Sequence, residues 1–318
     1  MITYTLRRLA QGLAVVVVAT FVTFLEAHLL PGNPARAILG VHASSAQITA
    51  FDKANGYDLP LPVQYVDYIG RLLRGNLGFS YQLNQSVAAL LSERLPATVI
   101  LVGLSVVVAL VCAVPIAVLQ AVRRNKPVDY TLTSASFAFY STPTFWLGLM
   151  LIMLFAVKVH VFPPVAPQGT AIQVLAHPLG LVLPVATLAF TSIAAFSRYL
   201  RSSLLDNLAE EYVRTARAKG APRRVVLYRH VLRNALAPLI TLIGLSLPGI
   251  LSGALITETV FNYPGMGLLF WNSAQSQDYP VLLGVTIVIA FGTVLGSLLA
   301  DLLYAVVDPR VRYQRQAR

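Results

Sequence analysis

The chain has 318 residues, of which 56% are hydrophobic and only 12% are charged. This composition and a mean hydropathy of +0.68 exclude an ordinary soluble domain and indicate an integral membrane protein. The formal net charge of +11 would suit nucleic-acid binding. In a membrane protein, however, the distribution of positive charges along the chain first indicates which loops face the cytoplasm. The single cysteine, Cys112, lies in an apolar run, so no disulfide can form within the chain.

The first apolar run covers residues 9–30 and is long enough to cross the hydrocarbon layer as a helix. Arg7 and Arg8 precede it, as in a signal peptide, but no small-residue cleavage site follows. We therefore expect a retained transmembrane helix. The next region, residues 31–95, is polar and is expected to hold short extramembrane helices. Its boundary signals are PGNP (31–34), Ser44 with Gln47, Gly56, Pro62, Gly75 with Gly78, and Ser86.

Five further apolar runs are each long enough to span a membrane: residues 97–121, 133–157, 178–200, 236–257 and 282–307. Together with the first run they predict an all-α membrane protein with six transmembrane helices. Pro143 lies inside one of these runs and predicts a kink. We expect two regions. Residues 1–95 form the first helix and the extramembrane part, and residues 96–318 form a five-helix core that carries a loop at 206–235.

Assigning alternate connections to alternate sides places 18 lysines and arginines on the side of the N-terminus and six on the other side. Because cytoplasmic loops carry the excess of positive charge, both termini and the loop at 206–235 are predicted to be cytoplasmic. The region 31–95 and the connections at 158–177 and 258–280 then face outward.

The connection from Asp206 to Ala235 is long and basic. Asn207, followed three residues later by Glu210, predicts a capping box at the start of a helix, and Gly220 predicts that helix's end. Pro222 suits the first position of a second helix. Two short helices are therefore expected to meet at a bend.

In the second of these helices, Val225, Tyr228 and Leu232 share one face, and most of the surrounding arginines project elsewhere. An apolar ridge inside a basic rim suits docking to another protein. A topology signal and a patch for anionic lipid headgroups are alternative interpretations of a basic loop. DNA binding by a basic helix-turn-helix is disfavoured, because the flanking spans hold the loop at the membrane.

Motifs for chemistry are absent from the sequence. It contains no GxxxxGK[ST] phosphate loop, no HExxH, no GxSxG and no close cluster of histidines and cysteines. Few ionisable residues lie within the apolar runs, which gives little support to an ion or proton relay. We therefore expect no catalytic site, metal site or cofactor in this chain.

The loop sequence EYVRTARAKG, followed by RHVLRNALAP, resembles the cytoplasmic loop of permease subunits of bacterial ATP-binding-cassette importers, in their dipeptide, oligopeptide and nickel branch. The resemblance extends over nearly the whole chain. Its other motifs, in matching order, are LPGNPARAILG near residue 30, SERLPATVILVGLS at 92–105, STPTFWLGLMLIMLFAV at 141–157, ETVFNYPGMGLL at 258–269, DYPVLLG at 278–284 and DLLYAVVDPRVR at 301–312.

The broader importer family has the letters EAA, three residues and then glycine in this loop. Here Arg214, Thr215 and Ala216 occupy the EAA positions and Gly220 occupies the glycine, so the acidic residue is missing, as the peptide branch commonly allows. Of the downstream I-x-L-P pattern, only Leu232 matches.

The resemblance implies the MetI-like fold of type I importer permeases, with a two-helix coupling loop that docks on cytoplasmic ATPase subunits. The coupling residues that it implies are Glu210, Glu211, Arg214, Thr215, Ala216, Arg217, Ala218, Lys219, Gly220, Pro222, Tyr228 and Leu232. ATP and magnesium would be bound by two ATPase subunits or domains. The other implied partners are a second, paralogous permease, an extracytoplasmic substrate-binding protein and membrane lipid, in the bacterial inner membrane.

On this interpretation the outward segments receive substrate from the binding protein. The candidate outer-gate or binding-protein contacts are Glu258, Phe261, Tyr263, Pro264 and Trp271. Peptides are the expected substrate, with nickel, haem or another small solute as alternatives. A stand-alone secondary transporter and an intramembrane enzyme are the competing classes. Both are disfavoured, because the sequence has few ionisable residues within its apolar runs and no evident catalytic pair.

Overall fold

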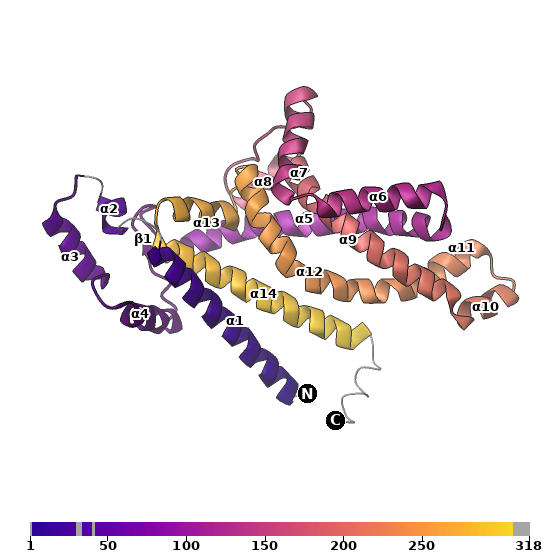
Figure 1. Cartoon of the computed structure of the whole chain (residues 1–318), viewed down its shortest axis with the longest axis horizontal. Coiled ribbons are helices and arrows are strands. Elements are labelled where there is room, and N and C mark those ends of the chain that lie inside the picture. The colour runs from indigo at the N-terminus through magenta and orange to yellow at the C-terminus, as the bar shows by residue number, and fades with distance from the viewer. Residues whose placement is uncertain (1, 30–33, 40–41, 308–318) are drawn as a thin grey trace.

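The computed structural model describes residues 2–29, 34–39 and 42–307, and helices dominate it (Figure 1). Residues 31–33 of the predicted breaker and the arginines after residue 307 lie outside the described residues. The elements are α1 (Ile2–Leu29), α2 (Pro34–Leu39), α3 (Ser45–Asn55), α4 (Leu61–Leu73), β1 (Phe79–Ser80), β2 (Gln85–Ser86), α5 (Val87–Val122), α6 (Pro127–Ser141), α7 (Thr144–Leu151), the π-helix η1 (Ile152–Lys158), α8 (Ala171–Ala176), the 3-10 helix η2 (Pro178–Leu181), α9 (Val182–Ala209), α10 (Glu211–Ala218), α11 (Arg223–Val225), the π-helix η3 (Val226–Val231), α12 (Leu232–Val260), α13 (Met266–Gln275) and α14 (Tyr279–Val307).

Figure 1 shows a bundle of long helices with small elements at its two ends. Helices α10 and α11 lie at one end, here called the loop end. Helices α2 to α4, the strands and α13 lie at the other, here called the hairpin end. Helix α1 runs beside α14 along the edge of the bundle.

Four helices are long and apolar enough to cross a membrane: 87–122, 178–209, 223–247 and 279–298. Helices α6 and α7 with η1 pass the same test only as a bent pair, so the described residues hold four candidate spans, or five if that pair is one span. Residues 10–26 and 250–260 are shorter apolar helices. The predicted total of six spans stays a prediction.

The run at 133–157 was expected to form one span with a kink at Pro143; the position of the kink is confirmed, but the helix is interrupted there. Helix α6 ends at Ser141, α7 begins at Thr144, and the two are bent by 108° relative to one another. The cause is local, because Pro143 disfavours helical geometry in the residue before it and Thr142 accordingly takes an extended ψ of 127°. The sequence signal at Pro143 therefore marks a break instead of a mild kink.

The core of the bundle lies between α5 and α9. Ala109, Ala113 and Ala117 recur at four-residue intervals on α5 and are fully buried. Small side chains on one helix face let a neighbouring backbone approach closely, as is common in membrane helix pairs. Larger residues on α9, among them Phe196 and Leu200, fill the space opposite and are also fully buried.

Helices α3 and α4 follow the predicted signals. Ser44 and Gln47 form a capping box at the start of α3, and Gly56 ends this helix with a left-handed φ of 71°. Pro62 lies in the first turn of α4. Helix α4 packs against α1, where the Tyr65 hydroxyl donates to the Val17 carbonyl at 3.1 Å. These predictions are confirmed.

The predicted turn before Ser86 is a short antiparallel hairpin, in which Phe79 pairs with Ser86 and Ser80 with Gln85. Ser86 then caps a helix, since its hydroxyl accepts from the backbone N–H of Ala89 at 3.3 Å. This helix is not short as expected. It continues to Val122 as α5, across the proposed boundary between residues 95 and 96.

Candidate functional site

The first half of the predicted coupling loop differs from expectation at its start. Helix α9 continues to Ala209, so no helix begins at Asn207, and the predicted capping box is wrong. The Asn207 side chain instead donates to the Ser203 carbonyl at 2.9 Å and accepts from the Tyr212 hydroxyl at 2.8 Å. Glu210 is the N-cap residue of α10 and makes no side-chain capping bond. Tyr212 thereby ties the new helix to the end of α9.

The bend at Gly220 is confirmed. Gly220 has a φ of +80°, its N–H donates to the Arg217 carbonyl at 2.9 Å, and the N–H of Ala221 donates to the Ala216 carbonyl at 3.1 Å. These two bonds define a Schellman motif, which needs a left-handed residue after the helix end. A Cβ atom at Gly220 would have no heavy atom within 4 Å. The requirement for glycine is therefore conformational and not steric.

The second half of the loop is continuous with the next span. Pro222 is the N-cap residue and α11 begins one residue later, at Arg223. The chain then passes through η3 into α12 without a break, so the expected separate short helix is in fact the first part of a long one. A proline before the first helical residue still directs the chain into the helix, because its φ is already restricted.

The apolar ridge predicted on this segment is partly exposed. Val225 and Tyr228 are 40% and 57% exposed, whereas Leu232 packs against the core. Most other coupling candidates are also exposed, namely Glu210, Glu211, Arg214, Thr215, Arg217, Ala218, Lys219 and Pro222, and Ala216 is half-buried. The loop end therefore presents two apolar side chains beside many charged ones.

Three valines anchor this exposed loop, and the sequence analysis did not single them out. Val213 on α10 and Val231 on η3 are fully buried, and Val226 is 1% exposed. All three belong to the main core cluster. The available signal was confined to Val213, which stands between Tyr212 and Arg214 in a largely polar helix, because Val226 and Val231 each stand beside a half-buried leucine. They hold the loop against the bundle while its charged face stays accessible.

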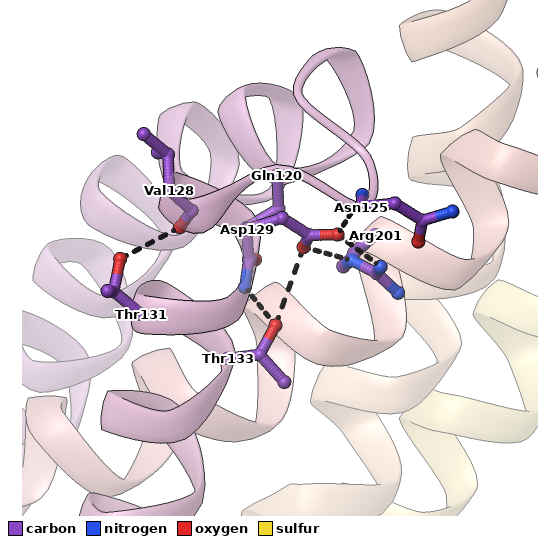
Figure 2. Close-up of polar contacts among 7 residues, drawn as sticks. All are labelled: Gln120, Asn125, Val128, Asp129, Thr131, Thr133 and Arg201. Atoms are coloured by element: carbon purple, nitrogen blue, oxygen red, sulfur yellow. Dashed lines mark hydrogen bonds and ion pairs between the residues drawn. The ribbon is translucent and has the colours of Figure 1, made fainter.

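An ion pair between a buried aspartate and a half-buried arginine near the loop end was also missed (Figure 2). Asp129, in the first turn of α6, is 2% exposed. Its Oδ1 accepts from Arg201 Nε at 2.8 Å and its Oδ2 from Arg201 Nη2 at 2.7 Å. The backbone N–H of Asn125 donates to the same Oδ2 at 3.0 Å. Two parallel bonds to a planar guanidinium fix both distance and orientation, so the pair sets the register of α6 on α9.

A second arginine reinforces the contact between these two helices. Arg198, one turn before Arg201 on α9, places its guanidinium 4.6 Å from the ring centre of Phe137 and 4.9 Å from that of Tyr140, both on α6. A cation above aromatic faces is attracted by their negative quadrupole face. Helix α9 therefore holds α6 by two arginines, which the sequence analysis counted only as topology signals.

At the hairpin end, the predicted gate residues form a compact turn. Glu258 on α12 is fully buried, and its Oε1 accepts from the Thr98 hydroxyl at 2.6 Å while its Oε2 accepts from the N–H of Gly267 at 2.5 Å. The N–H of Met266 in turn donates to the Thr98 hydroxyl oxygen at 2.8 Å. A carboxylate at the N-terminal end of α13 satisfies backbone donors that have no partner within the helix.

Other gate candidates lie in the same turn. The Tyr263 hydroxyl donates to the Ala97 carbonyl at 2.7 Å, and the Phe261 carbonyl accepts from the N–H of Ala166 at 2.8 Å. Both residues and Pro264 are buried, and Trp271 on α13 is 50% exposed. Four of the five candidates thus brace the turn, and Trp271 is the one on the surface.

A cavity of about 450 Å³, lined by both polar and apolar residues, lies beside this turn. Amide and hydroxyl side chains from several segments line it, including Gln168, Asn262, Asn272 and Ser276. Gln168 also secures the turn, because its Nε2 donates to the Asn262 carbonyl at 2.6 Å. Amide groups both donate and accept hydrogen bonds, so the cavity can bind peptide groups as well as water.

Across residues 2–29, 34–39 and 42–307, no group of three His, Cys, Asp or Glu side chains is arranged to hold a metal ion. The two ends of the bundle instead combine an exposed, anchored loop with a cavity next to a braced turn.

Comparison with known proteins agrees with this arrangement. Residues 113–313 match the family model described as "Binding-protein-dependent transport system inner membrane component", and residues 1–102 match the model of that component's N-terminal part. The architecture is thus that of a multi-pass membrane permease. The chain belongs to the family of binding-protein-dependent transport system inner membrane components.

Full-length relatives have similar descriptions. The chain is 37% identical over 316 residues to the oligopeptide transport system permease protein AppB of Bacillus subtilis, covering 98% of this chain and 100% of that protein. It is 37% identical over 328 residues to the probable D,D-dipeptide transport system permease protein DdpB of Escherichia coli, covering 96% of each. It is 35% identical over 342 residues to the dipeptide transport system permease protein DppB of Escherichia coli, covering 99% of this chain and 100% of that protein.

Proposed function

We propose that this chain is the permease subunit of an ATP-driven, binding-protein-dependent importer that moves peptides across the bacterial inner membrane. The observation that carries the proposal is the loop at 210–232, whose charged and apolar side chains are exposed while buried valines anchor it to the bundle. The full-length relatives of the chain are named as dipeptide, D,D-dipeptide or oligopeptide transport system permeases.

The loop end docks on a cytoplasmic ATPase. Val225 and Tyr228 supply apolar contact area, and the surrounding arginines with Glu210 and Glu211 supply a charged rim that orients the partner. ATP and magnesium bind in two such ATPase subunits or domains, because this chain carries no phosphate-binding loop. Closure of the ATPases on ATP moves this loop and its counterpart in a second, paralogous permease.

The hairpin end receives the substrate from an extracytoplasmic binding protein. Trp271 offers an exposed aromatic contact, and the neighbouring cavity offers hydrogen-bonding partners for peptide groups. Glu258, Phe261, Tyr263 and Pro264 hold the rim of this entrance in place and act as the outer gate.

The orientation follows from charge. With 18 of 24 lysines and arginines on the side of the N-terminus, both termini and the loop end face the cytoplasm. Six spans satisfy this orientation when α1 is added to the four long apolar helices and the bent pair is counted as one span.

Co-isolation tests the proposal directly. A tagged version of the chain is purified from its native membrane, and the expected complex contains two ATPase copies or domains and a second permease. After reconstitution into vesicles with a binding protein and ATP, labelled di- and oligopeptides are expected to accumulate. Accumulation by the chain alone, without ATP, would instead identify a secondary transporter.

The substrate class is tested with the same vesicles. Labelled peptides, nickel and haem are compared at equal concentration, each with and without ATP. Peptide accumulation together with background levels of nickel and haem is the expected result. ATP-dependent uptake of nickel or haem in preference to peptides would retain the importer mechanism and correct its substrate.

A further inference from the structure

The ion pair of buried Asp129 and half-buried Arg201 lies where α9, which leads to the loop end, contacts the start of α6. Arg201 lies on α9, which continues without a break to Ala209 and then turns at Glu210 into α10. Arg201 and Ala209 are eight positions apart, which is about 12 Å along a helix. A displacement of α10 is therefore carried to Arg201 by a single rigid helix, to which Tyr212 is hydrogen-bonded through Asn207.

On the other side of the pair, Asp129 controls the position of α6. This helix runs from Pro127 to Ser141 and ends at the 108° bend that leads into α7. The turn at residues 261–265, which joins α12 to α13, is here called the outer turn. Helix α7 packs against it, since a methyl group added at Gly148 would lie 3.2 Å from the Phe261 ring and 3.3 Å from Val260. Movement of α6 therefore reaches the start of α7 through the bend, and α7 itself packs against α9 and α12.

The other half of the loop reaches the same turn by a different route, because α11, η3 and α12 form one continuous run from Arg223 to Val260. The two halves of the loop therefore converge on Phe261, one directly through α12 and one through α9, α6 and α7. Along the second route, the crossing from α9 to α6 is made by the bidentate Asp129–Arg201 contact, with Arg198 over Phe137 and Tyr140 as a second contact.

We infer that Asp129 and Arg201 are positioning residues that transmit movement of the ATPase-docking loop to the bend at Thr142–Pro143 and so to the outer turn. The inference rests on the proposed function of the loop. An ion pair with two fixed hydrogen bonds suits this task better than apolar packing, because it holds one register and does not slide. Gln120 supports the site, since its Nε2 donates to the Thr133 hydroxyl at 3.1 Å (Figure 2).

Coupled ATP hydrolysis in the reconstituted complex tests the inference. Asp129→Asn removes the charge and keeps the size, and the double exchange Asp129→Arg with Arg201→Asp keeps the charges but reverses them. Thr131→Ala is the matched control, because Thr131 is exposed on the same helix and its hydroxyl bonds only the Val128 carbonyl of its own turn (Figure 2).

The expected result for Asp129→Asn is a normal basal rate of ATP hydrolysis with stimulation by loaded binding protein reduced to near that basal rate. Thr131→Ala should keep full stimulation, and the double exchange should regain part of it. Full stimulation in Asp129→Asn overturns the inference. If Asp129→Asn does not assemble, Arg201→Lys carries the test, because it keeps the charge and loses the two-bond geometry, and unaltered stimulation in it overturns the inference equally.

A distance measurement separates transmission from a merely structural role. Spin labels are placed on exposed Val111 of α5 and exposed Met150 of α7, after Cys112 is replaced by serine. In the parent complex the distance between the labels should change when ATP binds. In Asp129→Asn it should stay constant although ATP still binds, and a persisting change overturns the inference. A parent complex without any stimulated hydrolysis contradicts the proposed function itself.

Discussion

The hydroxyl of Thr98 on α5 donates a 2.6 Å hydrogen bond to Glu258 on α12, joining residues 160 positions apart in the chain. The second carboxylate oxygen of Glu258 accepts from Gly267 at the start of α13. One buried side chain therefore connects three helices at the hairpin end.

Replacing Glu258 by glutamine should destabilise this end of the protein. The amide –NH2 would face the N–H of Gly267 or the Thr98 hydroxyl, and a lost bond to a buried group costs about 1–3 kcal/mol. Thermal unfolding of the purified complex in lipid nanodiscs should show a lower midpoint. Glu93→Gln, an exposed glutamate on α5, is the control and should unfold like the parent. Equal midpoints for both variants would contradict the bracing role of Glu258.

Substitutions of Gly220 should uncouple ATP hydrolysis in the order of their left-handed propensity. Its φ of +80° costs an ordinary residue about 1–2 kcal/mol, asparagine less, and valine more because of its β-branch. Binding-protein-stimulated hydrolysis should therefore fall from Gly220→Asn to Gly220→Ala to Gly220→Val. Gly103→Ala, at a helical position with open space, should have no effect. Normal uptake by Gly220→Val would show that the bend is not needed for coupling.

Gly267→Ala should be poorly tolerated for a steric reason. A Cβ at Gly267 would lie 2.4 Å from the Cα of Leu255, which is backbone and cannot rotate away. Overpacking of this kind typically costs about 1–3 kcal/mol. The yield of folded complex after size-exclusion chromatography should drop. Gly292→Ala, whose Cβ would make an ordinary 3.8 Å contact, should give the parental yield, and a similar loss in both would refute the close packing of α13 on α12.

Stability should depend on pH through Asp278, which precedes α14. Burial raises the pKa of the Asp278 carboxyl above its usual range, although the hydrogen bond from Ser80 opposes this shift. A pKa that is higher in the folded state than in the unfolded state favours folding at low pH, and this contribution is lost as pH rises through the folded-state pKa.

Asp278→Asn removes this titration, so its unfolding midpoint relative to the parent should improve as pH increases from about 4, the usual carboxyl pKa, towards neutrality. Asp58→Asn, at an exposed aspartate, should show a constant difference over the same range. A flat difference for Asp278→Asn as well would mean that the buried carboxyl does not contribute.

The sequence by itself determined the class of protein and the features encoded within one or two helical turns. The capping box at Ser44 and Gln47 and the left-handed ends at Gly56 and Gly220 were predictable because all of their hydrogen bonds join residues at most five positions apart. The family resemblance was readable for a similar reason, since it rests on contiguous motifs.

Tertiary structure decided the remainder. Asn207 with Glu210 satisfied a local capping pattern, yet α9 continues past it, because the Asn207 side chain has partners in Ser203 and Tyr212. Pro143 signalled a kink, but the angle of 108° between α6 and α7 is known only from the structure. The pair of Asp129 and Arg201, 72 residues apart, and that of Thr98 and Glu258 had no local signal at all. Hydrogen bonds between distant side chains form only after the helices have packed, so a single sequence reveals the groups but not their partners.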